Sequence, residues 1–335
     1  MDWQNQVILI TGGTGSFGKK FVEIALNDLH PRKIIVFSRD ELKQHEMRTA
    51  GFDQSSLRYF IGDVRDRERL TRAMHGVDVV VHAAALKQVP ACEYNPMEAV
   101  KTNIMGTSNV VEAALDAGVK KVMALSTDKA VNPVNLYGAT KLAAEKLTVQ
   151  SNNYAAGSAT RYACTRYGNV VGSRGSVVPV FLSQREHGKV TVTDDRMTRF
   201  WLSLEQGVRF VIDCIDQMHG GEVFVPKIPS MKVIDLAKAI APAAAISVIG
   251  IRPGEKLHEV LISEDEARNA VERDHMFIVK PPETLWERNL HYDGTPLPEG
   301  FRYSSDNNKE WLDIEGIRRF VEPFERLYAV GKLGG

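Results

Sequence analysis

The chain has 335 residues, and its 42 Lys and Arg residues balance its 42 Asp and Glu residues. This length fits one large domain or two interlocked ones, and the 44% hydrophobic content is that of a globular protein. A neutral balance argues against a general nucleic-acid binder and against a disordered chain. The sequence has no apolar run of about 18 residues and no basic, apolar export segment at its start, so we expect a cytoplasmic protein with no membrane partner.

Short apolar runs alternate with segments of helical period through the first half of the chain. We predict strands at 7–10, 33–37, 57–61, 78–81 and 121–125, and helices at 17–27, 65–74 and 96–116. This order is typical of an α/β fold of Rossmann type, with a doubly wound parallel sheet. Beyond residue 169 we expect a strand at 190–193, a helix at 204–217 and a strand at 223–225.

The domain organisation predicted from this pattern is interleaved. We assign residues 1–170 to the Rossmann domain, with a later segment at about 203–226 returning to it, and residues 171–335 mainly to a smaller C-terminal lobe. Ligands of such sheets bind at the carboxyl ends of the strands, so the residues that follow each strand are the candidates for function.

A glycine-rich segment follows the first predicted strand and precedes the first helix. Its sequence is Thr11-Gly12-Gly13-Thr14-Gly15-Ser16-Phe17-Gly18. Glycines at this spacing permit a tight turn, a close approach to a pyrophosphate and close helix packing, and the helix N-terminus offers free N–H groups to phosphates. The expected dinucleotide-binding residues here are Gly12, Thr14, Gly15, Ser16, Phe17 and Gly18. The alternative is a glycine turn that binds nothing.

The residues after the second strand indicate which dinucleotide is bound. Ser38, Arg39 and Lys43 suit the 2′-phosphate of NADP, whereas Asp40 keeps NAD open, and a solvated helix start is the structural alternative. Further along, Asp63 and Val64 follow the third strand, and Ala83 and Ala84 follow the fourth, at positions that would hold adenine or admit the cofactor. Small residues at a strand end are also ordinary packing.

Tyr137 and Lys141 stand four residues apart after the fifth strand, so on a helix they share a face. A nearby ammonium can lower the pKa of a phenol and make it a base near neutral pH. The pattern occurs again at Tyr328 and Lys332, so its position after the fifth strand carries the argument.

The glycine-rich segment, the Tyr137/Lys141 pair and the interrupted second lobe resemble the extended short-chain dehydrogenase/reductase superfamily. Within it, the chain is similar to the inverting UDP-N-acetylglucosamine 4,6-dehydratases that begin pseudaminic acid synthesis. The resemblance rests on Ser126-Thr127-Asp128-Lys129-Ala130, Asn135-Leu136-Tyr137-Gly138-Ala139-Thr140-Lys141, Ala84-Ala85-Leu86-Lys87, Arg166-Tyr167-Gly168-Asn169-Val170 and Arg252-Pro253-Gly254-Glu255-Lys256. Lys129 replaces the glutamate of the glucose 4,6-dehydratases, and Tyr137 stands where retaining relatives typically carry methionine.

The resemblance implies a reaction that oxidises C4 of the sugar, eliminates water across C5 and C6 and returns the hydride to C6. Tyr137 would act as the base at C4, and Lys141 would hold the cofactor ribose. Lys129, if neutral, would take the C5 proton, and Asp128, if protonated, would donate to the leaving C6 hydroxyl. Thr127 would hydrogen-bond the C4 oxygen. A simple Asp128–Lys129 ion pair would weaken this assignment.

Substrate-binding residues also follow from the resemblance. Lys87 and Asn169 would contact the sugar or pyrophosphate, Lys87 and Val170 would border the cofactor, and Arg252 and Glu255 would hold the UDP portion, with Arg199 as a second phosphate-binding candidate. A surface turn around Pro253-Gly254 is the structural alternative for the Arg252/Glu255 pair.

Two other enzyme functions remain open, a retaining UDP-N-acetylglucosamine 4,6-dehydratase and a sugar-nucleotide 4-epimerase. An NADP-sensing binding protein of the same fold is the non-enzymatic alternative. The three cysteines, Cys92, Cys164 and Cys214, are widely spaced, so we expect no disulfide framework and no metal site. We expect NADP as the cofactor, UDP-N-acetylglucosamine as the small-molecule partner, no nucleic-acid partner, and a homo-oligomer.

Overall fold

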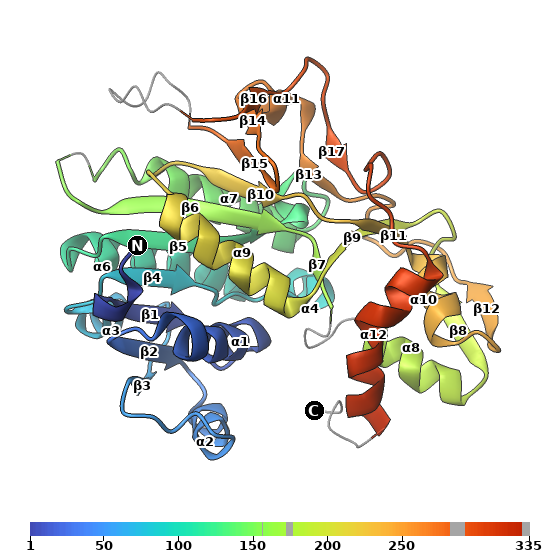
Figure 1. Cartoon of the computed structure of the whole chain (residues 1–335), viewed down its shortest axis with the longest axis horizontal. Helices are drawn as coiled ribbons and strands as arrows, with labels where there is room; N and C mark the ends of the chain where they lie inside the picture. The colour runs from blue at the N-terminus through green and yellow to red at the C-terminus, as the bar shows by residue number, and fades with distance from the viewer. Residues whose placement is uncertain (156, 172–176, 282–291, 330–335) are drawn as a thin grey trace.

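The computed structural model describes residues 1–155, 157–171, 177–281 and 292–329, and within them one large sheet dominates (Figure 1). Its strand order is β16-β14-β15-β10-β6-β5-β4-β1-β2-β3. The strands from β3 to β10 are parallel, and β15, β14 and β16 extend the sheet in antiparallel fashion. The parallel strands are β1 (Val7–Thr11), β2 (Lys33–Ser38), β3 (Leu57–Ile61), β4 (Val79–His82), β5 (Lys121–Thr127), β6 (Arg161–Tyr167) and β10 (Val223–Pro226). The predicted Rossmann-type sheet is confirmed.

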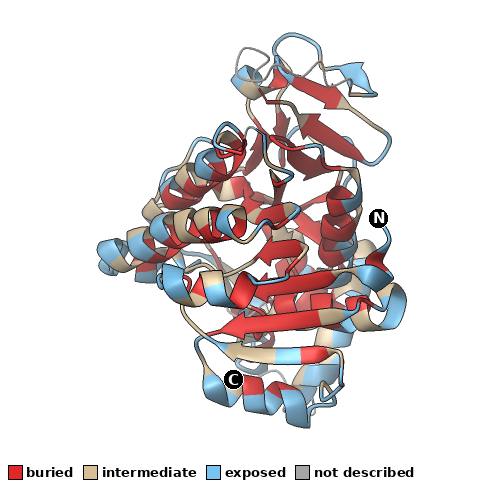
Figure 2. Ribbon diagram, turned by 90° about the vertical axis from the view of Figure 1, so that its left-hand side faces the viewer, coloured by how far each residue is buried: buried red, intermediate tan, exposed pale blue. Residues whose placement is uncertain are grey.

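Both faces of the sheet are buried, which explains the continuous apolar runs of its strands. In β1, Ile8 and Ile10 pack into one core while Leu9 packs into the core on the opposite face. Helices α1 (Ser16–Ile24) and α9 (Leu204–Gln217) cover the first face, and α3 (Arg67–Met74), α6 (Gly106–Asp116) and α7 (Leu136–Gln150) cover the second (Figure 1). The buried strands therefore run between two partly exposed helical layers (Figure 2).

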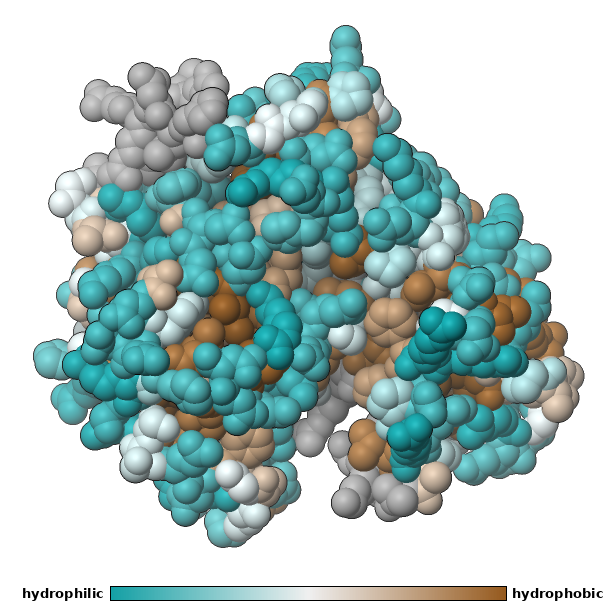
Figure 3. Space-filling view, viewed as in Figure 1, coloured by the Kyte–Doolittle hydropathy of each residue, from teal (hydrophilic) through white to brown (hydrophobic). Residues whose placement is uncertain are grey.

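The smaller lobe has its own core, centred on Trp201, Leu236 and Ile317. It contains helices α8 (Val177–Glu186), α10 (Val233–Ile240) and α12 (Ile314–Ala329), which pack against one another. Its strands pair as β7 (Asn169–Val170), β9 (Thr198–Leu202) and β11 (Ser230–Lys232), and as β8 (Lys189–Val192) with β12 (Ala245–Val248). A further pair, β13 (Val260–Ile262) with β17 (Tyr303–Ser304), joins this lobe to the large sheet, because Leu261, Ile262 and Tyr303 pack into the core of that sheet. In the space-filling view a hollow separates this lobe from the sheet layers (Figure 3).

Later parts of the chain return to the large sheet. Helix α9 and strand β10 belong to its layers, and so do β14 (Ala270–Glu272), β15 (Met276–Val279) and β16 (Thr295–Pro296). The sequence pattern indicated the first return but not the second, because these three strands are short and follow a loop-rich stretch.

Three other features differ from the predicted elements. Helix α2 (Glu41–Thr49) and strand β6 carry too many polar residues for their apolar period to show. The predicted helix at 96–116 consists of α5 (Pro96–Ala99), a π-helical turn at Val100–Met105 and α6. A Cβ on Gly106 would meet Val64 Cγ2 at 2.7 Å, so only glycine permits this close approach. In the second Tyr/Lys pair, Tyr328 lies in the last turn of α12 (Ile314–Ala329), and Lys332 lies outside the described residues.

The remaining short elements complete the chain. They are α4 (Val89–Tyr94), α11 (Glu264–Ala267), 3-10 turns at Trp3–Asn5 and Asp128–Ala130, and a π-helical turn at Ala25–Leu29. The 3-10 turn at 128–130 follows directly from the end of β5, so it holds two candidate catalytic residues at the carboxyl edge of the sheet.

Candidate active site

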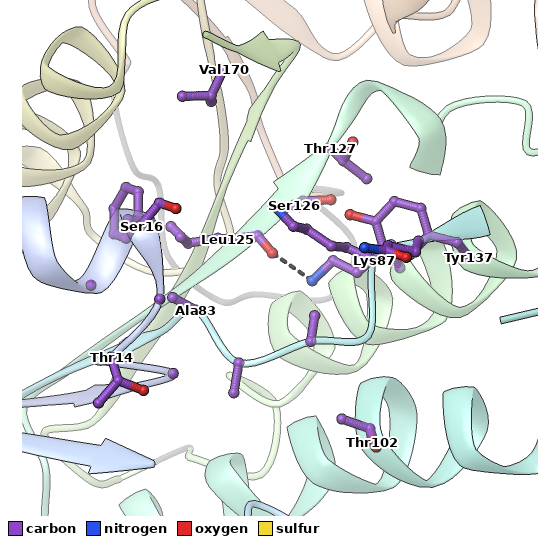
Figure 4. Close-up of a pocket in the computed structure, with 18 of the residues that line it drawn as sticks. Thr14, Ser16, Ala83, Lys87, Thr102, Leu125, Ser126, Thr127, Tyr137 and Val170 are labelled. Carbon is purple, nitrogen blue, oxygen red and sulfur yellow. Dashed lines mark hydrogen bonds between the residues drawn. The ribbon is translucent and has the colours of Figure 1, made fainter. Parts of the chain in front are cut away.

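A cavity of about 1170 Å³ lies along the carboxyl ends of the parallel strands and extends to the smaller lobe. It is bounded by the glycine-rich loop, the ends of β2, β4, β5 and β6, helix α7, and Val177, Trp201 and Leu204. Figure 4 shows Thr14, Ser16 and Ala83 toward one end and Lys87, Thr127 and Tyr137 toward the other. The cavity is large enough for a dinucleotide together with part of a second ligand.

The glycine-rich loop forms one wall of the cavity because its glycines permit contacts that side chains would block. Gly12 has a φ of +66°, and a Cβ there would meet the backbone N of Ala84 at 3.0 Å. A Cβ on Gly18 would collide with the carbonyl oxygen of Gly13. Helix α1 begins at Ser16, so its free N–H groups face the cavity, as a pyrophosphate site requires.

The predicted determinants of cofactor type line the far end of the cavity. Asp40 Oδ1 accepts a hydrogen bond from Lys43 N at 3.0 Å and caps α2, and its other oxygen pairs with Lys43 Nζ at 2.6 Å. These bonds with Lys43 lower the pKa of the Asp40 carboxyl. The Arg39 guanidinium is 55% exposed and lies 3.7 Å from Asp63. Ser38 Oγ accepts a hydrogen bond from Gln44 at 3.0 Å.

Almost all of the predicted cofactor residues border this one cavity. Those that do are Gly12, Thr14, Gly15, Ser16, Phe17, Gly18, Ser38, Arg39, Asp40, Lys43, Val64, Ala83, Ala84, Lys87, Tyr137, Lys141 and Val170. Asp63 is the exception. Its carboxylate accepts hydrogen bonds from Arg65 at 2.7 to 2.9 Å, which hold it away from the cavity wall.

Tyr137 and Lys141 lie on α7 and both line the cavity, but they do not form the pair expected from their spacing. Lys141 Nζ donates to the carbonyl oxygen of Leu125 at 2.6 Å (Figure 4). Burial raises the pKa of Tyr137 to about 12, and the charge that opposes this shift comes from Lys129. Burial also lowers the pKa of Lys141. The expectation that Lys141 lowers the pKa of Tyr137 is therefore wrong.

The Asp128–Lys129 pair departs from the predicted charge states. Lys129 Nζ lies 3.0 Å from Asp128 Oδ1 and 3.3 Å from Glu259 Oε1. Although burial opposes its ionisation, these two carboxylates raise the pKa of Lys129, so the neutral amine considered from sequence does not match the site. Burial raises the pKa of Asp128, in the direction that a proton donor needs.

Asp128 is fully buried and lies behind the cavity wall instead of on it. Its Oδ1 accepts hydrogen bonds from Lys129 Nζ and from Thr127 Oγ1, the latter at 2.9 Å. Its Oδ2 is buried without a partner among the described residues. Thr127 and Lys129 do line the cavity, so they connect Asp128 to it.

The predicted substrate residues fall into two groups. Lys87, Asn169 and Val170 line the cavity, and the side-chain oxygen of Asn169 is buried with no hydrogen-bond partner among the described residues. Arg199, Arg252 and Glu255 lie outside it. The Arg199 guanidinium donates to the carbonyl oxygens of Thr198, Lys256 and Leu257. Arg252 is exposed on its loop.

Several supporting residues were not identified from the sequence. His82 joins Thr11 at 2.8 Å and Thr107 at 3.1 Å, and burial lowers its pKa to about 3, so the ring is neutral. Asn103 lies in the π-helical turn, where its Oδ1 accepts a hydrogen bond from Leu86 N and its Nδ2 donates to the Leu86 carbonyl oxygen. The capping rule could have identified Asn135, whose Oδ1 accepts from Gly138 N at 2.8 Å at the start of α7.

Two kinds of feature are absent from the described residues. No helix in the ranges described above is both long and apolar enough to cross a membrane. Within those same ranges, no group of three or more His, Cys, Asp or Glu side chains is arranged to hold a metal ion.

Comparison with known proteins gives matches over nearly the whole chain. A family model described as "Polysaccharide biosynthesis protein" matches residues 8–281. The chain is 55% identical over 327 residues to "UDP-N-acetylglucosamine 4,6-dehydratase (inverting)" of Campylobacter jejuni, a match that covers 95% of this chain and 98% of the relative. It is 45% identical over 328 residues to "UDP-glucose 4-epimerase" of Rickettsia conorii, covering 95% of each. The solved structure of Pen from Bacillus thuringiensis is 38% identical, has a TM-score of 0.87, and is matched over 96% of this chain and 100% of its own.

Proposed function

The chain belongs to the polysaccharide biosynthesis protein family, and on that premise we propose that it is a UDP-N-acetylglucosamine 4,6-dehydratase that inverts C5. The resemblance to the inverting dehydratases is confirmed over 95% of the chain. One observation carries the proposal. Thr127, Lys129, Tyr137 and Lys141 all line the same cavity as the glycine-rich loop. These groups supply the bases and hydrogen-bond donors that an oxidation followed by an elimination requires.

NADP is the proposed cofactor, held by the glycine-rich loop, by the residues after β2 and by Lys141. When bound, its nicotinamide accepts a hydride from C4 of the sugar and later returns it to C6. The choice of NADP over NAD rests on the groups at the end of β2. The Asp40 carboxylate is already used as a helix cap and in a 2.6 Å contact with Lys43, while Arg39 is 55% exposed, has a 3.7 Å contact with Asp63, and can reach a 2′-phosphate.

Tyr137 is the proposed base at the C4 hydroxyl. Its phenol lines the cavity and is 9% exposed. The positive charge of Lys129 already opposes the effect of burial on its pKa, and Lys141, one turn further along α7, adds a second cation if ligand binding releases it from Leu125. Thr127 would hydrogen-bond the C4 oxygen from the end of β5.

The elimination step is proposed to use Lys129 and Asp128 in their uncharged forms. These forms arise from the observed ion pair when one proton moves from Lys129 Nζ to Asp128 Oδ1, across 3.0 Å. The transfer needs no proton from outside, and the exclusion of water by a bound sugar favours the uncharged pair. Lys129 would then take the C5 proton, and the proton of Asp128 would reach the C6 hydroxyl through Thr127.

The nucleotide portion of the substrate is proposed to lie toward the smaller lobe. Asn169, with its unpartnered oxygen, and Lys87 would contact the sugar and pyrophosphate. Arg252 and Glu255 would hold the uridine diphosphate, and Arg199 would support their loop through its bonds to the Lys256 and Leu257 carbonyls. In this arrangement residues 1–170 form the NADP-binding domain and 171–335 mainly the nucleotide-sugar lobe.

The finer points of the cellular role are also proposals. We propose a cytoplasmic homo-oligomer that acts in pseudaminic acid synthesis, because two relatives, each 55% identical to this chain, are named inverting dehydratases of this sugar nucleotide. Light scattering on the purified chain tests the oligomeric state, since a monomeric mass would contradict it.

The decisive experiment is incubation with UDP-N-acetylglucosamine and NADP in D2O, followed by proton NMR. We expect a 4-keto-6-deoxy product of L-arabino configuration, with deuterium at C5. A D-xylo product would refute inversion, and unchanged sugar with bound cofactor would favour an NADP-binding protein. The 45% identity to a protein named UDP-glucose 4-epimerase makes epimerisation the second candidate, and a product that keeps its C6 hydroxyl would establish it.

A further inference from the structure

Glu259 is a buried carboxylate that the sequence did not indicate as functional. Its side chain is 3% exposed, and it stands immediately before β13. Ser305 fixes its backbone on both sides, because Glu259 N donates to Ser305 Oγ at 2.9 Å and Ser305 N donates to the Glu259 carbonyl oxygen at 2.8 Å. The position of the carboxylate is therefore set by the smaller lobe.

Three cations surround this carboxylate. Lys129 Nζ lies 3.3 Å from Oε1, Arg199 Nε lies 3.9 Å from Oε1, and Lys256 Nζ lies 3.8 Å from Oε2. Although burial opposes ionisation, these cations hold the pKa of Glu259 below its usual value. Oε2 has no hydrogen-bond partner among the described residues. Glu259 thus carries a fixed negative charge next to a candidate catalytic amine.

The charges that face Lys129 come from three parts of the chain. Asp128 is its neighbour in the 3-10 turn, Tyr137 faces it from α7, and Glu259, Arg199 and Lys256 face it from the smaller lobe. The two carboxyl groups differ in kind, since the pKa of Asp128 is raised and that of Glu259 is lowered. When one of them must take a proton, Asp128 takes it and Glu259 stays ionised.

We propose that Glu259 is a positioning residue that holds the Lys129 side chain against the substrate for the elimination step. This inference rests on the proposed function. In that step the C5–H bond breaks, its proton goes to Lys129 Nζ, and its electron pair forms the C5–C6 double bond. The C6–O bond breaks, and the hydroxyl leaves as water with the proton of Asp128. The site ends as ammonium and carboxylate, which is the ion pair seen at 3.0 Å.

The contact at 3.3 Å from Nζ favours this step because it holds the reacting amine in place, and a displacement of about 1 Å can cost about 10²-fold in rate. It does not assist the earlier oxidation at C4, in which Lys129 exchanges no proton. Weakening this contact should therefore slow elimination more than oxidation, which separates this role from simple support of the fold.

The test compares Glu259→Gln with wild type in stopped-flow mixing with UDP-N-acetylglucosamine and NADP. We expect reduced nicotinamide to accumulate in the variant, kcat to fall about 10- to 100-fold, and KM to change by less than about threefold. Removing the anion lowers the pKa of Lys129, so the limb of the kcat–pH profile that reports its titration should move to lower pH by about one unit or more.

Two further variants serve as controls. Glu259→Asp keeps the charge and should recover part of kcat, with a smaller pH shift in the same direction. Glu222→Gln removes a buried carboxylate that lies away from the cavity and accepts bonds from His219 N and Gly220 N, so it should leave the pH profile unchanged. Melting temperatures of all variants report the effect on folding.

Specific results would overturn the inference. Glu259→Gln with the kcat and pH profile of wild type would do so, and so would equal slowing of oxidation and elimination. If Glu259→Gln does not fold, a Glu259→Asp variant with an unshifted pH profile refutes the proposal. A wild-type protein that leaves UDP-N-acetylglucosamine unchanged would instead remove the proposed function, and this inference with it.

Discussion

Arg39→Ala should lower the affinity for NADP while leaving the affinity for NAD nearly unchanged. The guanidinium is the group after β2 best placed for a 2′-phosphate, since the neighbouring Asp40 carboxylate is already engaged by Lys43. Arg39 itself has only a loose contact with Asp63, at 3.7 Å, and Asp63 is satisfied by Arg65. Little protein-internal interaction is therefore lost when Arg39 is removed.

The expected magnitude follows from the exposure of the side chain. Hydrogen bonds to charged groups contribute about 1.5–3 kcal/mol each when well shielded. Because Arg39 is 55% exposed, solvent and salt screening reduce the total to about 1–2 kcal/mol. This free energy corresponds to NADP binding that is about 5- to 30-fold weaker.

Calorimetric titration of both dinucleotides into wild type and variant measures the effect. Arg48→Ala is the matched control, because Arg48 is an exposed arginine of the adjacent helix α2 that stacks on Tyr59 and does not line the cavity. The reasoning is refuted if Arg39→Ala binds NADP as tightly as wild type, or if its affinities for NADP and NAD fall equally. A wild-type preference for NAD would equally rule out the NADP assignment.

The other predictions concern the base, the helix cap and a buried histidine. Tyr137→Phe should lower kcat about 10²- to 10⁴-fold with NADP binding retained, and comparable turnover in a kinetic assay would remove Tyr137 as the base. Asn135→Ala should lower the free energy of unfolding by about 1–3 kcal/mol, because it loses the cap on α7 and the 2.8 Å bond to the Gly254 carbonyl oxygen; denaturant melts check this, with the exposed Asn153→Ala as control. His82 has a pKa of about 3 when folded and about 6.5 when unfolded, so the unfolded chain binds more protons between these values and stability should fall by about 1.4 kcal/mol per unit as pH drops through this window. His82→Asn should have a flatter dependence than wild type there, and equal slopes would contradict the assignment.

The strands of the first half could be predicted from the sequence because both faces of the sheet are buried. Continuous apolar runs mark β1, β2 and β4, and the glycine pattern marks the turn that follows β1. Strand β6 escaped this test. Its Arg166 is completely buried and forms ion pairs with Glu145 of α7 and Glu266 of α11. From sequence alone, a charged residue is expected at the surface, because the partners that allow its burial are known only from the structure.

The candidate site was predicted in its membership but not in its charge states. Spacing on a helix places Tyr137 and Lys141 on one face, yet it does not show that Lys141 donates to Leu125. Likewise, the adjacency of Asp128 and Lys129 does not show that Glu259 shares the amine. Charge states depend on burial and on every charge nearby, and these come from segments more than a hundred residues apart in the sequence.

One loop of the smaller lobe makes the most consequential of these distant contacts. Between Gly254 and Glu259 it meets the catalytic segment at three points: Asn135 donates to the Gly254 carbonyl oxygen at 2.8 Å, Lys256 donates to the Val131 carbonyl oxygen at 2.6 Å, and Glu259 pairs with Lys129. The same loop carries Arg252 and Glu255, the proposed ligands of uridine diphosphate. A nucleotide that orders this loop would therefore also fix the start of α7 and the charge beside Lys129, so binding of the remote nucleotide would assist the chemistry at the sugar. It follows that UDP added to the protein without sugar should already protect the amides of residues 129–138 from hydrogen exchange, and unchanged exchange there would separate nucleotide binding from the catalytic groups.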